Sequence, residues 1–284
     1  MLIILIPLIV VNIQNKDKIT EVNSDLLNSG EKNMSTEVPQ PPPEKKVDEL
    51  VTYKGPIDDL NYYDYMAENG NVHKLILDEK GEISTYSVNP AGEEVIAYDN
   101  EIIPILEQFI KKHPDFSFQG ARGIIALTGY SGILGYRTNE LTSPNYEKEK
   151  NEALQVVNRL KETGWTFASH GYGHLDANKI RYNTLVKDTK RWKEEVASLI
   201  GPTPIYIYPY GSSVQEKSDK FTYLQDRGFH IFFSVGPAPY LKINDNYILM
   251  DRRHIDGLAF YDQRDRLLDM FDSNEVLDPL RPDN

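Results

Sequence analysis

The sequence predicts an α/β fold, in which the strands of a parallel sheet are joined by helical crossovers. From about residue 51, short apolar runs alternate with longer segments whose apolar residues recur at helical spacing. Polar side chains directly follow several of the apolar runs, and such side chains collect at the C-terminal edge of a parallel sheet. The chain is therefore expected to form either an open sheet or a (β/α) barrel.

The first part of this pattern contains two helices and two strands. Residues 100–113 form an amphipathic helix, and residues 122–130 are a short apolar run that is typical of a buried strand. Residues 145–164 form a second helix, with Gly164 as its C-cap. Residues 165–170 return to a strand pattern.

The same rhythm continues towards the C-terminus. Residues 177–201 predict a helix that ends at a glycine, and residues 204–211 predict a strand. A helix is expected over residues 218–229, followed by strands over residues 230–236 and 246–257. The whole folded region is expected to span residues 51–284.

The N-terminal segment differs from the rest. Residues 1–12 form an apolar run of about signal-peptide length, which we interpret as a secretion signal or membrane anchor. Residues 13–50 are polar, rich in proline and aperiodic, so we expect a disordered spacer. Together they predict an extracellular or cell-surface protein, secreted or membrane-anchored, that meets the membrane only through this segment.

Composition excludes several kinds of site. The formal net charge is −12, and no basic segment suits nucleic-acid phosphates, so we expect no nucleic-acid partner. The chain contains no cysteine, which excludes disulfides, thiolate zinc sites and a cysteine nucleophile.

Two histidines suggest a metal site. His170 and His174 directly follow an apolar run, and imidazoles on one side of a turn can share an ion with a carboxylate and water. Two histidines at this spacing also arise by chance on protein surfaces. Upstream, Asp58 and Asp59 are adjacent, and such pairs are usually solvated. Beside two histidines, one aspartate could bind the metal ion and the other could act as a base.

These motifs resemble those of a known family. Asp58–Asp59, His170-x-x-x-His174 and the sequence YPYG at residues 208–211 are similar, in this order, to the motifs of the NodB-like polysaccharide deacetylases, carbohydrate esterase family 4. The segments DDLNYYDYM, GIIALTGYSGILGYRT and MDRRHIDG further resemble the Gram-positive cell-surface branch of that family. The resemblance covers roughly residues 55–257. It implies a distorted (β/α) barrel and a hydrolase that removes N- or O-linked acetyl groups from an extracellular glycan, with peptidoglycan or a related wall polymer favoured.

The resemblance also implies a metal centre. Asp59, His170 and His174 would hold a divalent ion, with zinc favoured. Asp58 would be the general base that deprotonates the attacking water.

Other residues around this centre are assigned in the same way. The backbone N–H of Tyr210 would help bind the oxyanion. His254 is the candidate acid for the leaving amine, although a structural histidine explains it equally well. Arg252 or Arg253 could orient the base, although a solvated charge explains either equally well, and Arg252 is also a candidate for substrate binding. Apart from the resemblance, Tyr172 and Tyr208 are expected to bind sugar, because aromatic rings near the site suit stacking on sugars, although tyrosines at strand ends are also ordinary packing.

The sequence departs from the family pattern in the motifs themselves. Gly171 stands where the family has serine or threonine, and Ile207 stands where it has an arginine that partners the base. Unless a later arginine substitutes, the base lacks that partner.

Two longer segments also depart from the family. The region before the histidines is longer than usual, and residues 66–100 predict an inserted hairpin with turns at Lys80–Gly81 and Ala91–Gly92. The residues before Asp58, DELVTYKGPI, are not a strand-like apolar run, so the barrel is expected to lack its first part.

Three functions stay open on the sequence alone. The leading one is a monomeric, metal-dependent polysaccharide deacetylase. Its rival is a catalytically inactive glycan-binding barrel, which the missing arginine and the poor first strand favour. A metallopeptidase is weaker, because no glutamate lies between the two histidines.

Overall fold

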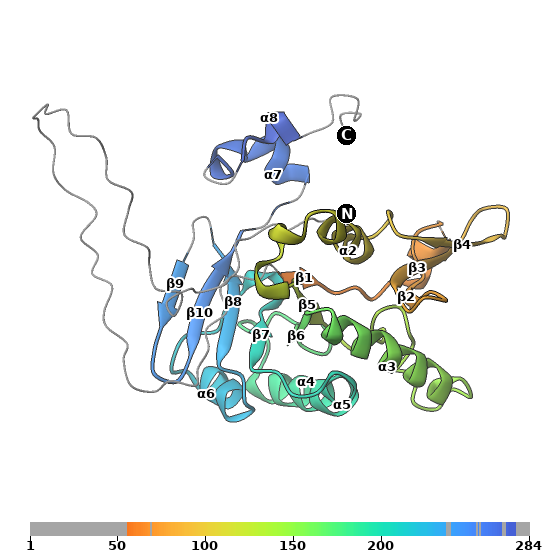
Figure 1. The fold of residues 1–284 in the computed structure, drawn as a ribbon. Coiled ribbons are helices and arrows are strands. Elements are labelled where there is room, and N and C mark those ends of the chain that lie inside the picture. The colour runs from red at the N-terminus through yellow and green to blue at the C-terminus, as the bar shows by residue number, and fades with distance from the viewer. Residues whose placement is uncertain are drawn as a thin grey trace, which may run out of the picture.

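The computed structural model describes residues 56–68, 70–236, 240–253, 255, 257–268 and 271–276 (Figure 1). The expected anchor and spacer, residues 1–12 and 13–50, and the candidate acid His254 lie outside these residues. Within them, no helix is both long and apolar enough to cross a membrane.

A seven-stranded sheet organises the fold. Its strand order is β1-β5-β6-β7-β8-β10-β9. All neighbours from β1 to β10 pair in parallel, whereas β9 pairs antiparallel with β10. The strands are β1 (Pro56–Asp58), β5 (Ile124–Leu127), β6 (Thr166–Ser169), β7 (Ile205–Ile207), β8 (Ile231–Val235), β9 (Tyr240–Ile243) and β10 (Ile248–Arg252). The predicted α/β fold class is confirmed.

Helices connect the parallel strands, as the sequence pattern predicted. In Figure 1, α3 to α6 lie along the lower side of the sheet, and α2 lies above it. The helices are α1 (Asp64–Glu68), α2 (Ile102–Lys112), α3 (Tyr146–Glu162), α4 (Tyr182–Glu195), α5 (Ala197–Ile200), α6 (Asp219–Asp226), α7 (Gly257–Asp262) and α8 (Ser273–Val276). Short 3₁₀ turns cover Pro114–Phe116, Phe118–Gly120, Pro209–Gly211 and Arg264–Arg266.

One predicted helix is shorter than expected. The helix expected over residues 177–201 begins only at Tyr182, and it is divided into α4 and α5 at Val196. The side chain of Asp176 accepts hydrogen bonds from the amides of Asn178 and Lys179, so the chain makes a local turn there instead of a helix.

The parallel strands are buried on both faces. Along β5, Ile125 and Leu127 join the large cluster that packs under the helices, whereas Ile124 and Ala126 join a second cluster on the opposite face. The second cluster consists of Ile124, Ala126, Ala168, Ile205, Ile207, Phe233, Ile248 and Met250. Burial on both faces explains why these strands read as continuous apolar runs.

The sheet curls into an incomplete barrel. Four strands separate β1 from β10, and at about 4.8 Å per strand a flat sheet would hold them roughly 24 Å apart. Yet Arg252 at the end of β10 contacts Asp58 at the end of β1, at 2.6 Å. In the described part of the chain, β1 and β9 form the open edges of the sheet. This agrees with a NodB-like barrel that is not closed.

The first strand is short but properly paired. Its three residues align with Ile124, Ile125 and Ala126 of β5. The Asp59 amide extends the ladder by donating to the Ala126 carbonyl at 2.9 Å. Pairing with β5 thus orders this segment, although the segment has few apolar residues of its own.

Residues 74–97 form a separate three-stranded antiparallel sheet of β2 (Lys74–Leu77), β3 (Ile83–Val88) and β4 (Glu94–Ala97). Both expected turns are present, with the amides of Gly81 and Gly92 donating across them. The sheet packs against α2 and α3 and lies at the right of Figure 1. It adds a layer beside the parallel sheet without interrupting its strand order.

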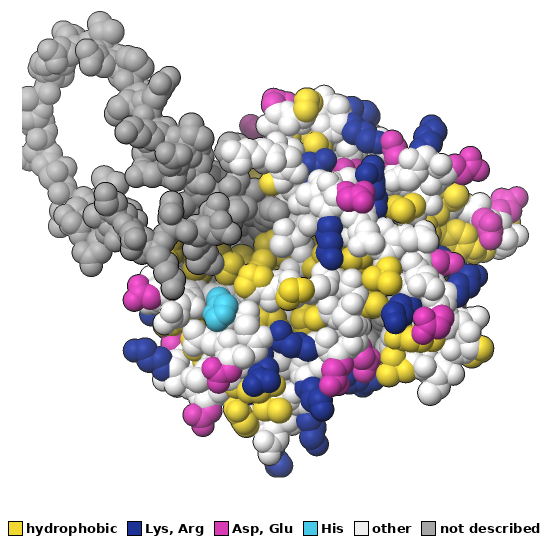
Figure 2. All heavy atoms as spheres, turned by 60° about the horizontal axis from the view of Figure 1, so that its bottom comes forward, with side chains coloured by type: hydrophobic (Ala, Val, Ile, Leu, Met, Phe, Trp, Pro, Cys, Tyr) yellow, Lys and Arg dark blue, Asp and Glu magenta, His cyan; other side chains and the backbone are white. Residues whose placement is uncertain are grey.

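The charges on the surface are mixed. On the face shown in Figure 2, acidic and basic side chains are interspersed, and the basic ones form no continuous area.

Candidate metal centre

The candidate site lies where the parallel strands end. Asp58 and Asp59 lie at the end of β1, His170 follows β6, and Arg252 ends β10. Because all these strands run in the same direction, their last side chains meet at one edge of the curled sheet. The structure therefore brings together residues that are far apart in the sequence.

Three side chains converge as a possible metal site. One donor atom from each of Asp59, His170 and His174 lies within 4.8 Å of the others. Donors that each lie about 2.1 Å from a tetrahedral ion would be roughly 3.4 Å apart, so a small inward shift would bring them into the coordination shell. One carboxylate and two imidazoles suit a divalent ion of the zinc type and leave further coordination positions open. The donor set fits the expected ion.

His170 is prepared to act as a ligand through one specific nitrogen. Its side chain is only 2% exposed, and Nδ1 lies 2.8 Å from the carbonyl oxygen of Ile207. A carbonyl only accepts hydrogen bonds, so Nδ1 carries the proton. Burial is the main influence that lowers the pKa of His170, so the ring is neutral near pH 7 and Nε2 keeps its lone pair.

His174 is more accessible than His170. Its side chain is 24% exposed, and its ring packs edge-on against His170, with centroids 4.9 Å apart. Its Nε2 atom lies 3.8 Å from an oxygen of Asp59. The backbone of His174 has a φ of 51°, an uncommon value for a residue with a side chain.

Asp58 faces the same centre but has a different partner. The Nη1 atom of Arg252 lies 2.8 and 2.6 Å from its two carboxylate oxygens. Burial raises the pKa of Asp58, but the charge of Arg252 and its hydrogen bonds to the carboxylate outweigh burial and hold this pKa below its usual range. Asp58 is therefore ionised near pH 7 and can accept a proton.

Two buried polar residues support Asp59, and the sequence analysis missed both. The Thr128 hydroxyl lies 3.4 Å from Asp59 Oδ1 and 2.7 Å from the amide nitrogen of Asn61. Thr128 is fully buried and Asn61 is 1% exposed. Asp59 itself has a φ of 72°. A sequence signal for Thr128 did exist, because it is the first polar residue after the apolar run of β5.

The tyrosines expected near the site are placed differently from one another. Tyr210 is 71% exposed and its ring packs against His174, with centroids 4.6 Å apart. Tyr172 and Tyr208 instead lie in the core, at 4% and 1% exposure. The ring of Tyr208 packs on Phe232, and the guanidinium of Arg191 lies over the ring of Tyr172, so neither core tyrosine offers a free face to a sugar. Their expected role in sugar binding is not supported by this placement.

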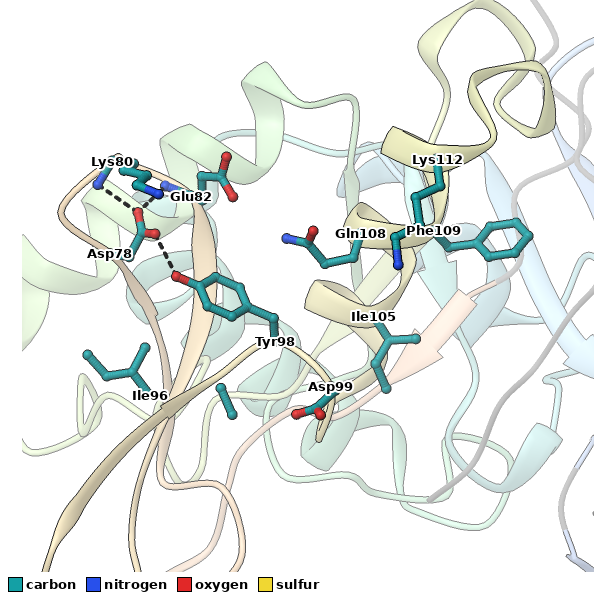
Figure 3. A pocket seen from close by; sticks show the side chains of 11 residues that line it. Asp78, Lys80, Glu82, Ile96, Tyr98, Asp99, Ile105, Gln108, Phe109 and Lys112 are labelled. Atoms are coloured by element: carbon teal, nitrogen blue, oxygen red, sulfur yellow. Dashed lines mark hydrogen bonds between the residues drawn. The ribbon is translucent and has the colours of Figure 1, made fainter.

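Two hollows among the described residues lie away from this centre. One, of about 740 Å³, lies between the three-stranded sheet and α2 (Figure 3). Its lining includes Asp78, whose carboxylate accepts from the Tyr98 hydroxyl at 2.6 Å. None of the predicted site residues lines it.

Part of the chain matches a known family. Residues 140–230 match the family model described as polysaccharide deacetylase. This segment is less than half of the chain, but it contains both histidines and the YPYG motif. The match agrees with the class of hydrolase that the sequence motifs predicted. No curated protein matches the sequence.

Several solved structures are similar in fold. The deacetylase PplD of Streptococcus pyogenes, in complex with acetate, is 16% identical; the alignment covers 51% of this chain and 57% of PplD, with a TM-score of 0.35. The chitin deacetylase of Colletotrichum lindemuthianum is 13% identical, with 58% and 74% covered and a TM-score of 0.32. Puue allantoinase is 11% identical, with 75% and 64% covered and a TM-score of 0.35. The chain thus spans less than two thirds of PplD and of the allantoinase.

Proposed function

We propose that this protein is a metal-dependent hydrolase that removes acetyl groups from an acetylated polysaccharide. The observation that carries the proposal is the convergence of Asp59, His170 and His174 beside an ionised Asp58. The polysaccharide deacetylase match over residues 140–230 supports the substrate class.

Each residue of the site has a separate part in this reaction. Asp59, His170 and His174 hold the ion, for which zinc fits the donor set best. When bound, the ion supplies Lewis acidity. Asp58 accepts a proton from the attacking water, and Arg252 keeps its carboxylate ionised and fixed in place.

The remaining steps concern the acetyl group. Water adds to the carbonyl carbon, and the bond from that carbon to the sugar nitrogen or oxygen breaks to release acetate. The backbone N–H of Tyr210 is our candidate for the donor that helps bind the oxyanion, and the packing of the Tyr210 ring against His174 supports its nearness to the site. His254 stays our candidate for the acid that protonates the leaving group. The exposed ring of Tyr210 suits contact with a sugar.

We further propose that the substrate is a cell-wall glycan such as peptidoglycan and that the protein works as a monomer outside the cell. The apolar run of residues 1–12 and the polar segment after it support this location. Cell fractionation with an antibody against the folded part tests it, and protein found only in the cytosol would contradict it.

Acetate release from acetylated chitooligosaccharides and from peptidoglycan tests the activity. The wild-type protein, reloaded with zinc after chelation, should release acetate. Asp58→Asn and His170→Ala should reduce the rate at least a hundredfold. Asp115→Asn is the matched control. Asp115 is an exposed acid that is not one of the proposed site residues, so its replacement should leave the rate unchanged. Glycan binding without acetate release would overturn the proposal in favour of a non-catalytic binding barrel.

A further inference from the structure

A buried carboxylate on α4 holds the loop between the two histidines. Asp188 is 9% exposed, and both of its carboxylate oxygens face residues 171–173. Oδ2 accepts the amide of Tyr172 and Oδ1 accepts the amide of Gly173, each at 2.8 Å. A buried carboxylate is costly unless it is hydrogen-bonded, and these two amides satisfy it.

The glycines of the loop make this approach possible. Gly171 has a φ of +68°, and a Cβ placed there would lie 3.1 Å from Oδ2 of Asp188. A Cβ at Gly173 would lie 3.3 Å from Oδ1. Side chains at either position would push the carboxylate away from the amides. The absence of side chains at these two glycines therefore lets the carboxylate of Asp188 reach the backbone amides between the two histidines.

The same helix holds the loop at a second point. The Tyr172 hydroxyl donates to Glu195 at 2.7 Å, two turns beyond Asp188 on α4. The Tyr172 carbonyl accepts the amides of Gly129 and Tyr130 from the end of β5, at 2.9 and 3.1 Å. This explains the burial of Tyr172, whose ring fixes the loop to the helix.

Helix α4 is itself fixed to the sheet. Trp192, one turn after Asp188, is fully buried, and its indole nitrogen donates to the Leu127 carbonyl at 2.8 Å. Leu127 is the last residue of β5, next to the strand ends that carry Asp59 and His170. The carboxylate thus links the histidine loop to a rigid support.

We propose that Asp188 is a positioning residue, which acts through the amides of Tyr172 and Gly173 to hold His170 and His174 in the arrangement that binds the ion. This inference rests on the metal centre of the proposed function. Residues that orient ligands in this way typically change metal affinity by 10- to 100-fold when they are replaced.

Zinc titration of the chelator-treated full chain by calorimetry tests the proposal. Asp188→Asn keeps the shape of the side chain but replaces one acceptor oxygen with an amide donor, so zinc affinity should fall at least tenfold. Glu194→Gln, an exposed acid on the same helix, should bind zinc as the wild type does. At saturating zinc, kcat of Asp188→Asn should recover towards the wild-type value. A merely structural role would lower the melting temperature of the metal-free protein with zinc affinity unchanged, and that result would overturn the proposal.

A pair of glycine variants keeps the test valid if Asp188→Asn does not fold. Gly171→Ala retains Asp188 but crowds it, and should weaken zinc binding at least tenfold. Gly81→Ala is the matched control, because Gly81 has a similar φ of +74° and a Cβ placed on it would meet no atom within 4 Å. Equal zinc affinity in both variants would overturn the proposal. If the wild-type protein binds no zinc, both this inference and the proposed function are overturned. If the wild type binds zinc and Asp188→Asn has the same zinc affinity, only this inference is overturned.

Discussion

Arg252 and Asp58 form an ion pair across the mouth of the incomplete barrel, with the Arg252 Nη1 atom 2.8 and 2.6 Å from the two oxygens of Asp58. Arg252 is 4% exposed, so the pair is poorly screened by water. Position 207, where the family has an arginine, is an isoleucine in this chain. The carbonyl of Ile207 accepts a hydrogen bond from Nδ1 of His170. Arg252, which ends β10, therefore lies beside the proposed base Asp58.

Replacing Arg252 with methionine should shift the pH dependence of catalysis. Without the cation, the main influence that lowers the pKa of Asp58 is lost while burial still raises it, so this pKa should rise. The acidic limb of kcat/KM should then move to higher pH by at least about one unit. The measurement is a pH profile of acetate release. Arg159→Met, which removes only a surface partner of Glu162, should leave the profile in place, and an unmoved acidic limb in Arg252→Met would contradict the role of the pair.

The two histidines should differ in what they contribute to the metal-free fold. His170 is buried and hydrogen-bonded to Ile207, so His170→Ala should cost about 1–3 kcal/mol of unfolding free energy even without metal. His174 is partly exposed, so His174→Ala should cost less than about 1 kcal/mol. Both variants should lose the rise in melting temperature that zinc gives the wild type. Melting curves with zinc and with chelator separate the two effects, and a zinc-dependent rise that persists in either variant would argue against its role as a ligand.

The sequence, with the family resemblance, was enough to predict the fold class and the three side chains that converge as a possible metal site. Alternating apolar runs and amphipathic helices predicted the parallel sheet, and polar residues directly after those runs predicted the strand-end cluster. Two signals indicated His170 and His174: they are four residues apart, and they directly follow a predicted strand. These signals are local, so a single sequence carries them.

Contacts between distant segments could not be predicted in the same way. The family resemblance offered Arg252 or its neighbour as a partner of Asp58, but the local sequence could not choose between them, because the contact depends on the curl of the whole sheet. The first strand appeared too polar to form, yet pairing with β5 orders it. Tyr172 was assigned to sugar binding because aromatic rings near the site suit stacking on sugars, but it packs against helix α4 and is buried, which fits the alternative of ordinary packing.

The metal-free protein should lose stability as the pH falls below about 6.5. The folded-state pKa of His170 lies below the unfolded value of about 6.5, because burial disfavours the charged ring. The unfolded chain therefore binds a proton in this range that the folded chain does not, and the unfolding free energy falls. Asp58 adds a second loss of unfolding free energy only below about pH 4. Its pKa is lower in the folded than in the unfolded chain, so its stabilising contribution is complete above the unfolded pKa and is lost as the pH falls below it. Urea unfolding in chelator at several pH values measures both ranges.

His170→Gln provides the control for the first range. It removes the titrating ring but keeps a polar side chain, so the decline between about pH 6.5 and pH 5 should become shallower while the loss below about pH 4 remains. An unchanged decline in this variant would show that another group causes it.

Tyr172→Phe should separate a role in the fold from a role in substrate binding. The Tyr172 ring is buried, and its hydroxyl donates to Glu195 at 2.7 Å. Removing the hydroxyl should lower the unfolding free energy by about 1 kcal/mol, because one buried hydrogen bond is lost while Glu195 keeps its pairing with Arg191. KM for acetylated oligosaccharides should stay unchanged, because the side chain does not reach the surface where a sugar binds. Urea unfolding and steady-state kinetics on the same preparation test both expectations, and a raised KM at unchanged stability would return Tyr172 to the substrate site.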